Sequence, residues 1–267
     1  MKKILYLILL ITSVSFGQTA NYYYNEGLDK FESKDYKGAI LEFTKSININ
    51  PNDAETYTNR GVAKNILKDY EGAILDFTKA ININPNYAKA YKQRGVVKVD
   101  LKDYEGAILD FTSAIEISSY DIISFYLRGQ AKSDLKDYYG AIVDFTKIIN
   151  FGSDLNLEAY YSRGKAKFNS KDYDSAILDF TKAININPNY YEAYFARGHA
   201  NGKLKDFQGA ITDFTKVINI NPKYTFAYIN RAKAKAYLNN MIGACQDAKK
   251  AQDLGYDATE LINIVCK

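Results

Sequence analysis

The sequence is poor in the residues that metal sites and acid–base catalysis use most. Its 267 residues include one His, two Cys and no Trp, although Tyr occurs 24 times. A single imidazole leaves little material for His-based metal sites or for general acid–base catalysis, and two cysteines cannot form a Cys-rich zinc site. We therefore expect a protein that is not an enzyme and that holds no metal and no other cofactor.

An excess of charge of one sign is also missing. The chain has 35 Lys and Arg against 31 Asp and Glu, a formal net charge of +4, and no block of like charges. Nucleic-acid binding usually needs a marked basic excess or a basic stripe. We therefore expect no nucleic-acid partner.

Residues 1–17 resemble a signal peptide. Two lysines follow Met1, and an apolar stretch then runs from Ile4 to Phe16, too short for a membrane span of about 20 residues. Small residues precede Gln18, which predicts cleavage before it. The alternative is an uncleaved N-terminal anchor helix, which the polar residues inside the stretch disfavour. We predict an exported protein, periplasmic or secreted, without stable membrane insertion after cleavage.

An internal repeat fills the rest of the chain. A Lys-Asp-Tyr motif or a close relative recurs every 34 residues, with one step of 35, and such a period indicates a stacked repeat array. Within a unit the apolar residues follow helical spacing, as in Tyr70, Ala73, Ile74 and Phe77. Each unit is therefore predicted to be a two-helix hairpin that buries its apolar face against its neighbours. The motif begins at Lys34, Lys68, Lys102, Lys136, Lys171 and Lys205, with a weaker copy at Asn239.

Four columns of residues carry a family resemblance. They are a glycine on the first helix, an alanine on the second, an aromatic residue four positions later, and a proline in the closing turn. The glycines are Gly27, Gly61, Gly95, Gly129, Gly164 and Gly198; the alanines are Ala39, Ala73, Ala107, Ala141, Ala176, Ala210 and Ala244; the aromatic residues are Phe43, Phe77, Phe111, Phe145, Phe180 and Phe214; the prolines are Pro51, Pro85, Pro188 and Pro222. A further aromatic residue stands early on every first helix, Tyr57 in the second copy.

With these columns the chain resembles the tetratricopeptide repeat family over residues 20–258. The resemblance implies an all-α fold, a right-handed α-solenoid of seven helix-turn-helix repeats starting near residues 20, 54, 88, 122, 157, 191 and 225. A short C-terminal capping helix is expected at 259–267, because a terminal repeat needs a cover for its last apolar face. The family's concave face, lined mainly by first helices, binds peptides or protein segments.

Two junctions lack the closing proline, at residues 118–121 and 151–154, and they bracket the fourth repeat. Drift is the simpler interpretation, because Ser, Gly and Asp also form turns. The alternative is an altered curvature that opens the groove for a ligand.

Two charged columns predict contacts between repeats. Because the first repeat has Glu26 in place of Arg and no preceding repeat, we predict that each Arg pairs with the acid of the repeat before it, starting with Arg60 and Glu42. Such a ladder would set the register of stacking; the alternative is an anion-binding stripe. The arginines are Arg60, Arg94, Arg128, Arg163, Arg197 and Arg231, and the acids are Glu42, Asp76, Asp110, Asp144, Asp179, Asp213 and Asp247.

The two cysteines flank the turn that follows the last repeat. Cys245 and Cys266 would lie level in an antiparallel helix pair, and export favours their oxidation. We predict a disulfide that fastens the cap to the array and contributes roughly 3 kcal/mol in the chain-entropy model. Two buried free thiols are the alternative.

The resemblance also implies which side chains face the groove. The fifth position of successive repeats and the ninth position should do so, and three consecutive repeats then present an aromatic ladder of Tyr126, Tyr161 and Phe195. None of the seven ninth positions is Asn, so the family's carboxylate-clamp ligands are not expected. The rings could equally serve only to pack the repeats. The groove candidates are Tyr24, Lys92, Tyr126, Tyr161, Lys165, Phe168, Phe195, His199, Ile229 and Lys233.

Two hypotheses for function follow. The first is a protein–protein interaction module of the cell envelope that binds an extended peptide or protein segment on its concave face. The second is a structural or assembly spacer that acts by self-association or stacking and has no dedicated peptide ligand.

Overall fold

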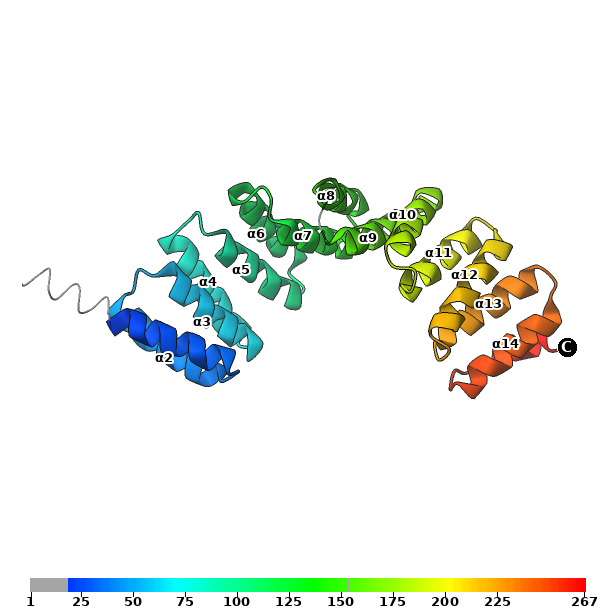
Figure 1. The fold of residues 1–267 in the computed structure, drawn as a ribbon, viewed down its shortest axis with the longest axis horizontal. Helices are drawn as coiled ribbons and strands as arrows, with labels where there is room; N and C mark the ends of the chain where they lie inside the picture. The colour runs from blue at the N-terminus through cyan, green and yellow to red at the C-terminus, as the bar shows by residue number, and fades with distance from the viewer. Residues whose placement is uncertain (1–18, 153) are drawn as a thin grey trace, which may run out of the picture. The chain divides into compact units, whose positions relative to one another are not determined.

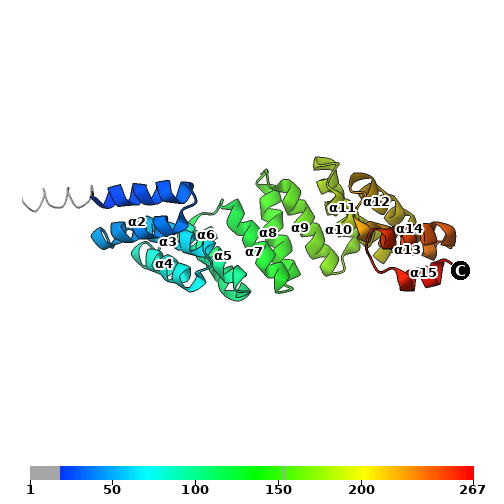
Figure 2. The same ribbon diagram turned by 90° about the horizontal axis from the view of Figure 1, so that it is seen from below.

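The computed structural model describes residues 19–152 and 154–267, and every regular element within them is an α-helix (Figure 1). The predicted signal peptide, residues 1–17, lies outside the described residues. Within residues 19–135 and within residues 136–267, successive helices pack side by side in chain order (Figure 2). The predicted all-α class of stacked helix-turn-helix repeats is confirmed.

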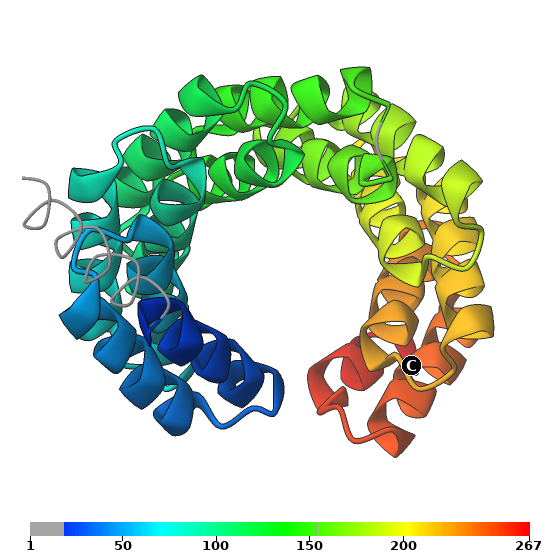
Figure 3. The ribbon, with the colours of Figure 1, turned by 60° about the vertical axis from the view of Figure 1, so that its left-hand side comes forward.

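The chain divides into two compact units, with the boundary between Leu135 and Lys136. Each unit is two helices thick, as Figure 3 shows. The first unit contains a helix described over residues 19–32 and then α2 (Tyr36–Ile49), α3 (Ala54–Ile66), α4 (Tyr70–Ile83), α5 (Ala88–Asp100), α6 (Tyr104–Ile117) and α7 (Ile122–Asp134).

The second unit is built in the same way and ends with a shorter helix. It contains α8 (Tyr138–Asn150), α9 (Asn156–Asn169), α10 (Tyr173–Ile186), α11 (Tyr191–Lys203), α12 (Phe207–Ile220), α13 (Thr225–Tyr237), α14 (Met241–Asp253) and α15 (Thr259–Val265). Throughout the described residues, no helix combines the length and the apolarity that crossing a membrane would need.

The Lys-Asp-Tyr motif forms the turn inside each hairpin. Lys68 has a φ of 64°, in the left-handed region, which lets the chain leave α3. The backbone N–H of Asp69 then donates to the carbonyl of Lys64 at 2.9 Å, and its side chain accepts from the N–H of Gly72 at 3.0 Å. That side chain caps α4, which begins at Tyr70. Each residue of the motif therefore has a separate role in the turn.

A glycine on the first helix and a phenylalanine on the second form the centre of each hairpin. The ring of Phe180 is fully buried, and a Cβ atom added to Gly164 would lie 2.7 Å from its Cε1 atom. The two helices therefore approach as closely as they do only because the first carries no side chain at this point. The same contact occurs between Gly61 and Phe77 and between Gly198 and Phe214.

The last hairpin replaces this contact with smaller residues and a cap. Ala232 and Ala248 stand where the pattern has Gly and Phe, and both are buried with Val265 of α15 in one apolar cluster. Cys245 and Cys266 form a disulfide that joins α14 to the end of α15. The predicted capping helix and its disulfide are therefore both present in the structure.

Glycine-to-alanine substitutions should separate the packing role of Gly164 from the intrinsic helix preference. We expect Gly164→Ala to lower the free energy of unfolding by about 1–2 kcal/mol, because the buried ring of Phe180 must move. Gly202→Ala is the control. A Cβ atom there would meet nothing within 4 Å, so this change should raise stability by about 0.5–1 kcal/mol. Urea unfolding followed by circular dichroism measures both; equal effects would contradict the packing argument.

Candidate functional site

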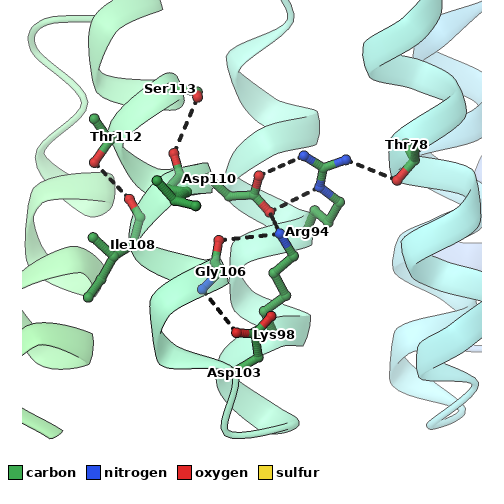
Figure 4. A network of polar contacts seen from close by, with 10 residues as sticks. Thr78, Arg94, Lys98, Asp103, Gly106, Ile108, Asp110, Thr112 and Ser113 are labelled. Atoms are coloured by element: carbon green, nitrogen blue, oxygen red, sulfur yellow. Dashed lines mark hydrogen bonds and ion pairs between the residues drawn. The ribbon is translucent and has the colours of Figure 1, made fainter. Parts of the chain in front are cut away.

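Five arginines of the charged column lie against the acid of their own hairpin, as Figure 4 shows for Arg94. The Nε and Nη2 atoms of Arg94 donate to the two carboxylate oxygens of Asp110 at 3.0 and 2.7 Å. The Nζ atom of Lys98 lies 2.8 Å from the same carboxylate, whose side chain is only 4% exposed. A buried carboxylate with two cationic partners and a bidentate hydrogen-bond pattern is a fixed structural element.

The third contact of the guanidinium reaches the preceding repeat. The Nη1 atom of Arg94 donates to the hydroxyl oxygen of Thr78 at 2.9 Å (Figure 4), and Thr78 lies on α4. The guanidinium also lies over the ring of Tyr91, 5.8 Å from its centroid. The arginine thus holds its own hairpin together with two bonds and joins it to the previous hairpin with one.

For these five arginines, the predicted pairing with the acid of the preceding repeat is wrong. Arg60 binds Asp76 of its own hairpin at 2.7 Å and reaches the preceding repeat through the hydroxyl of Thr44 at 3.0 Å, while Glu42 pairs with Lys45. The reason is the geometry of the guanidinium, whose two parallel donors need both oxygens of one carboxylate, and only the acid of the facing helix presents them. The remaining donor needs a single acceptor, which a hydroxyl supplies.

The same arrangement recurs in both units. Arg128 donates to Thr112 at 3.0 Å within the first unit. In the second unit the matching sets of arginine, aspartate and threonine are Arg163 with Asp179 and Thr146, Arg197 with Asp213 and Thr181, and Arg231 with Asp247 and Thr215.

The threonine column is a signal that the sequence reasoning missed. A threonine stands two residues after the acid in the first six repeats, but the seventh, which α15 follows, has Lys249 there. The first repeat in turn has Glu26 in place of Arg. Each arginine of the second to seventh repeats therefore has a threonine in the repeat before it, and this match predicts the observed contact. The six threonines are Thr44, Thr78, Thr112, Thr146, Thr181 and Thr215.

Thr181→Val should test the contact between repeats without touching the pair inside the hairpin. The change keeps the shape of the side chain and removes the acceptor for Arg197, so we expect the free energy of unfolding to fall by about 1 kcal/mol. Thr212→Val is the matched control, because the Thr212 hydroxyl donates to the carbonyl of Gln208 as that of Thr181 does to Ile177, and Thr212 is exposed. Denaturant unfolding of both variants measures the difference, and equal losses would count against a role for the arginine contact.

The sixth repeat departs from this arrangement at one position. Where other repeats have a lysine next to the buried acid, it has Asn201, which donates to the Oδ2 atom of Asp213 at 3.1 Å. Burial raises the pKa of Asp213, and the bonds from Arg197 and Asn201 only partly offset that rise. Since the folded-state pKa lies above that of the unfolded chain, ionisation of Asp213 lowers stability as the pH rises through that pKa.

Asn201→Lys should therefore stabilise the second unit. The new ammonium group would occupy the place that Lys167 has beside Asp179, lower the pKa of Asp213, and raise the free energy of unfolding by about 1 kcal/mol at neutral pH. The gain should fade as the pH falls below about 4, where carboxyl groups protonate. Gln208→Lys, an added charge on exposed surface, is the control; thermal unfolding across the pH range that shows no difference between the two would contradict this account.

The first unit uses two groove candidates for internal contacts. The hydroxyl of Tyr24 accepts from the side chain of Asn59 at 3.1 Å, and burial raises its pKa. The ammonium of Lys92 lies 2.9 Å from Asp121, which also caps α7 through the N–H of Ser124. Burial of Asp121 opposes ionisation, but the bonds from Lys92 and Ser124 outweigh it and hold its pKa below the usual range. At the junction without proline, Asp121 therefore forms the turn.

Tyr126 is half-buried on α7 of the first unit. It does not line the hollows of the second unit, which are described next.

Five predicted groove residues of the second unit lie together around one hollow. Tyr161, Lys165 and Phe168 of α9 and Phe195 and His199 of α11 surround a volume of about 310 Å³. The ring of Tyr161 lies 5.0 Å from that of Tyr190. The ammonium of Lys165 lies 5.7 Å from the centroid of the Tyr161 ring. We call this space the aromatic hollow. Its rings take part in packing and are also partly accessible.

A second hollow adjoins the first. It has a volume of about 220 Å³, and His199, Lys203 and Lys233 contribute cationic or titratable side chains to it. His199 lines both hollows, with its ring 4.6 Å from Phe195 and 5.5 Å from Phe214. Burial, with Lys203 and Lys233 nearby, lowers the pKa of His199, so its imidazole is neutral at neutral pH. We call this space the basic hollow.

The assignment of Ile229 to the groove is wrong. Its side chain is 4% exposed and packs with Tyr228, Ala251 and Ala258, beside Leu261 of α15. The cap that follows the seventh repeat covers this position. Across residues 19–152 and 154–267, no three His, Cys, Asp or Glu side chains come together as a metal site would require.

Comparison with known proteins identifies the repeats. Family models described as tetratricopeptide repeat match residues 54–87 and 157–190 and residues 191–224. No curated protein matches the chain in sequence.

Solved structures share the fold. A tetratricopeptide repeat protein from Parabacteroides merdae is 21% identical, with a TM-score of 0.67, and the match covers 94% of this chain and all of that one. The C-terminal part of a repeat protein from Cytophaga hutchinsonii has a TM-score of 0.78 at 20% identity, over 90% of this chain and 98% of that chain. MamA protein has a TM-score of 0.59 at 25% identity, over 63% of this chain and 92% of that chain.

Proposed function

The chain is a tetratricopeptide repeat protein, and we propose that it binds an extended segment of a partner protein in the groove of its second unit. By this groove we mean the aromatic and basic hollows together. Tetratricopeptide repeats are in general non-catalytic scaffolds for protein–protein interaction. The observation that carries the proposal is the aromatic hollow, where Tyr161, Phe168 and Phe195 line an open space of about 310 Å³. Apolar rings that remain accessible in a concave site are typical anchors for partner side chains.

We further propose that this binding takes place in the cell envelope or outside the cell. The disulfide between Cys245 and Cys266 supports an oxidising compartment, and the sequence of residues 1–17 supports export. The partner on this proposal is an envelope or secreted protein.

A structural role without a dedicated ligand is the second candidate. It is favoured by a column of leucines on successive second helices of the first unit, Leu41, Leu75 and Leu109, which are 57%, 70% and 70% exposed. Such a stripe could mediate contact between copies of the chain.

Alanine substitution of the two central rings should distinguish the candidates. We expect Tyr161→Ala with Phe195→Ala to reduce binding of the partner by about tenfold or more, because each ring is an anchor of the kind that dominates interfaces. The double variant Tyr139→Ala with Leu178→Ala is the control, since both residues belong to the second unit, are strongly exposed and lie outside the hollows. The measurement is quantitative recovery of cross-linked partners from envelope extract.

Light scattering on the same proteins gives the complementary result. If the groove variants recover the same partners as the parent, the groove proposal is overturned. If the chain also self-associates and Leu75→Glu with Leu109→Glu abolishes that association, the structural role is supported. Circular dichroism of each variant confirms that the helices remain folded.

A further inference from the structure

The first helix of the sixth repeat, α11, carries a run of residues that other first helices lack. Its groove side presents His199, Gly202 and Lys203. The residue that corresponds to Gly202 is Phe168 in the fifth repeat and Ala236 in the seventh. The basic hollow therefore lies where this position of the first helix is a glycine.

Gly202 has no packing reason to be glycine. The other first-helix glycines face a phenylalanine ring, as Gly164 faces Phe180, but a Cβ atom at Gly202 would meet nothing within 4 Å. A glycine inside a helix costs about 0.5–1 kcal/mol relative to alanine. The effect of this glycine on the folded structure is to leave open the space that Phe168 occupies one repeat earlier. A residue that lowers stability and opens a hollow is typical of a binding site.

The basic hollow also has unbalanced positive charge. Lys203 and Lys233 are exposed at its rim, and its lining contains no Asp or Glu. By contrast, Lys167 and Lys235 of the same unit each lie within 2.8 Å of a buried aspartate. Within the described part of the chain, no ion pair is found for Lys203 or Lys233. These two ammonium groups are therefore available to an anion from outside.

The walls of the basic hollow are aromatic. The rings of Phe207 and Tyr237 stack on one side, with centroids 4.5 Å apart and planes 8° from parallel, and the ring of Phe214 lies behind His199. Charges next to such walls interact with an anion more strongly than they would in open water. A volume of about 220 Å³ accommodates a side chain, and the aromatic hollow next to it accommodates a larger one.

From these observations we propose that the groove selects an acidic peptide segment, with an Asp or Glu side chain in the basic hollow and a neighbouring bulky apolar side chain in the aromatic hollow. Lys203 and Lys233 bind the carboxylate, and His199 stands between the two side chains. This assignment rests on the proposed function and adds to it the chemistry of the ligand. Charge complementarity identifies the occupant, because the hollow offers cations without a carboxylate of its own.

The position of His199 makes the binding sensitive to pH. In the protein without ligand, burial lowers the pKa of His199, and Lys203 of its own helix and Lys233 of α13 add to that effect. A bound carboxylate offsets them and raises the pKa of His199, so the complex takes up a proton. Affinity for an acidic peptide should therefore increase as the pH falls from about 8 to about 6, while the peptide carboxylates stay ionised.

Selection from short random peptides displayed on phage, with the full-length chain as bait, tests the proposal. We expect enriched sequences to combine Asp or Glu with an adjacent Phe, Tyr, Leu or Met. Synthetic copies of the enriched peptides then serve as probes in fluorescence anisotropy. Lys203→Gln with Lys233→Gln should weaken their binding about tenfold or more, and Lys182→Gln with Lys216→Gln, an equal charge change at exposed sites on α10 and α12, should not.

Gly202→Leu separates occupation of the hollow from loss of folding. Leucine favours the helix over glycine and fills the basic hollow, so the variant should be at least as stable as the parent and bind the acidic probes about tenfold more weakly or worse.

Three outcomes would overturn the assignment. Enriched peptides without acidic residues whose binding still depends on Tyr161 and Phe195 would leave the groove as a binding site and refute its acidic ligand. The same conclusion follows if free acetate or inorganic phosphate displaces the probes at concentrations similar to those of the peptides. Absence of any enriched peptide whose binding depends on the groove would refute the proposed function as well.

Discussion

The fold depends on an arginine that is held in three directions at once. Two of its donors bind the buried carboxylate of the facing helix, its plane lies over an aromatic ring of its own helix, and its last donor reaches a threonine of the preceding hairpin, as with Arg94, Asp110, Tyr91 and Thr78. The strong, charge-assisted bonds stay inside a hairpin, and a weaker neutral acceptor joins one hairpin to the next. The charged pair therefore belongs to one hairpin, and the polar contact between hairpins is made by a single hydroxyl beside their apolar packing.

Because of this division, the side chains of the first helices that face the groove contribute little to the contacts that hold the hairpins together. The glycine, the arginine and the early aromatic residue serve the hairpin, whereas positions such as those of Phe195, His199 and Gly202 face the groove. Those positions can change from repeat to repeat without altering the stack. The sixth repeat shows how far such change extends, since it also has Asn201 in place of the lysine beside the buried acid. Burial raises the pKa of Asp213, and the bonds from Arg197 and Asn201 only partly offset that rise. Weaker internal pairing and an open hollow occur in the same hairpin.

Periodicity was enough to predict the helices, the hairpins, the cap and the disulfide, because each follows from residue spacing along the chain. It was not enough to pair the arginines correctly. The repeat positions predict which residues lie near one another. The direction of the Arg60 side chain depends, however, on which acceptors can bind the parallel N–H donors of a planar guanidinium group. Ile229 was misplaced for a related reason: its position in the repeat faces the groove, yet α15 covers it. The opening at Gly202 could not be predicted, because the sequence does not show that the space beside this glycine is empty.

The disulfide between Cys245 and Cys266 makes the last hairpin of the array more resistant to local opening. A terminal repeat has a neighbour on one side only, so local opening of stacked repeats starts at the ends. Here the last hairpin cannot separate from its cap while the cross-link is intact, and fraying from that end is suppressed. The hairpins that contain the aromatic and basic hollows precede this cross-linked end, so opening that starts there reaches them less readily. In a reducing compartment that asymmetry would vanish, and the redox state of the surroundings would decide how long the groove persists.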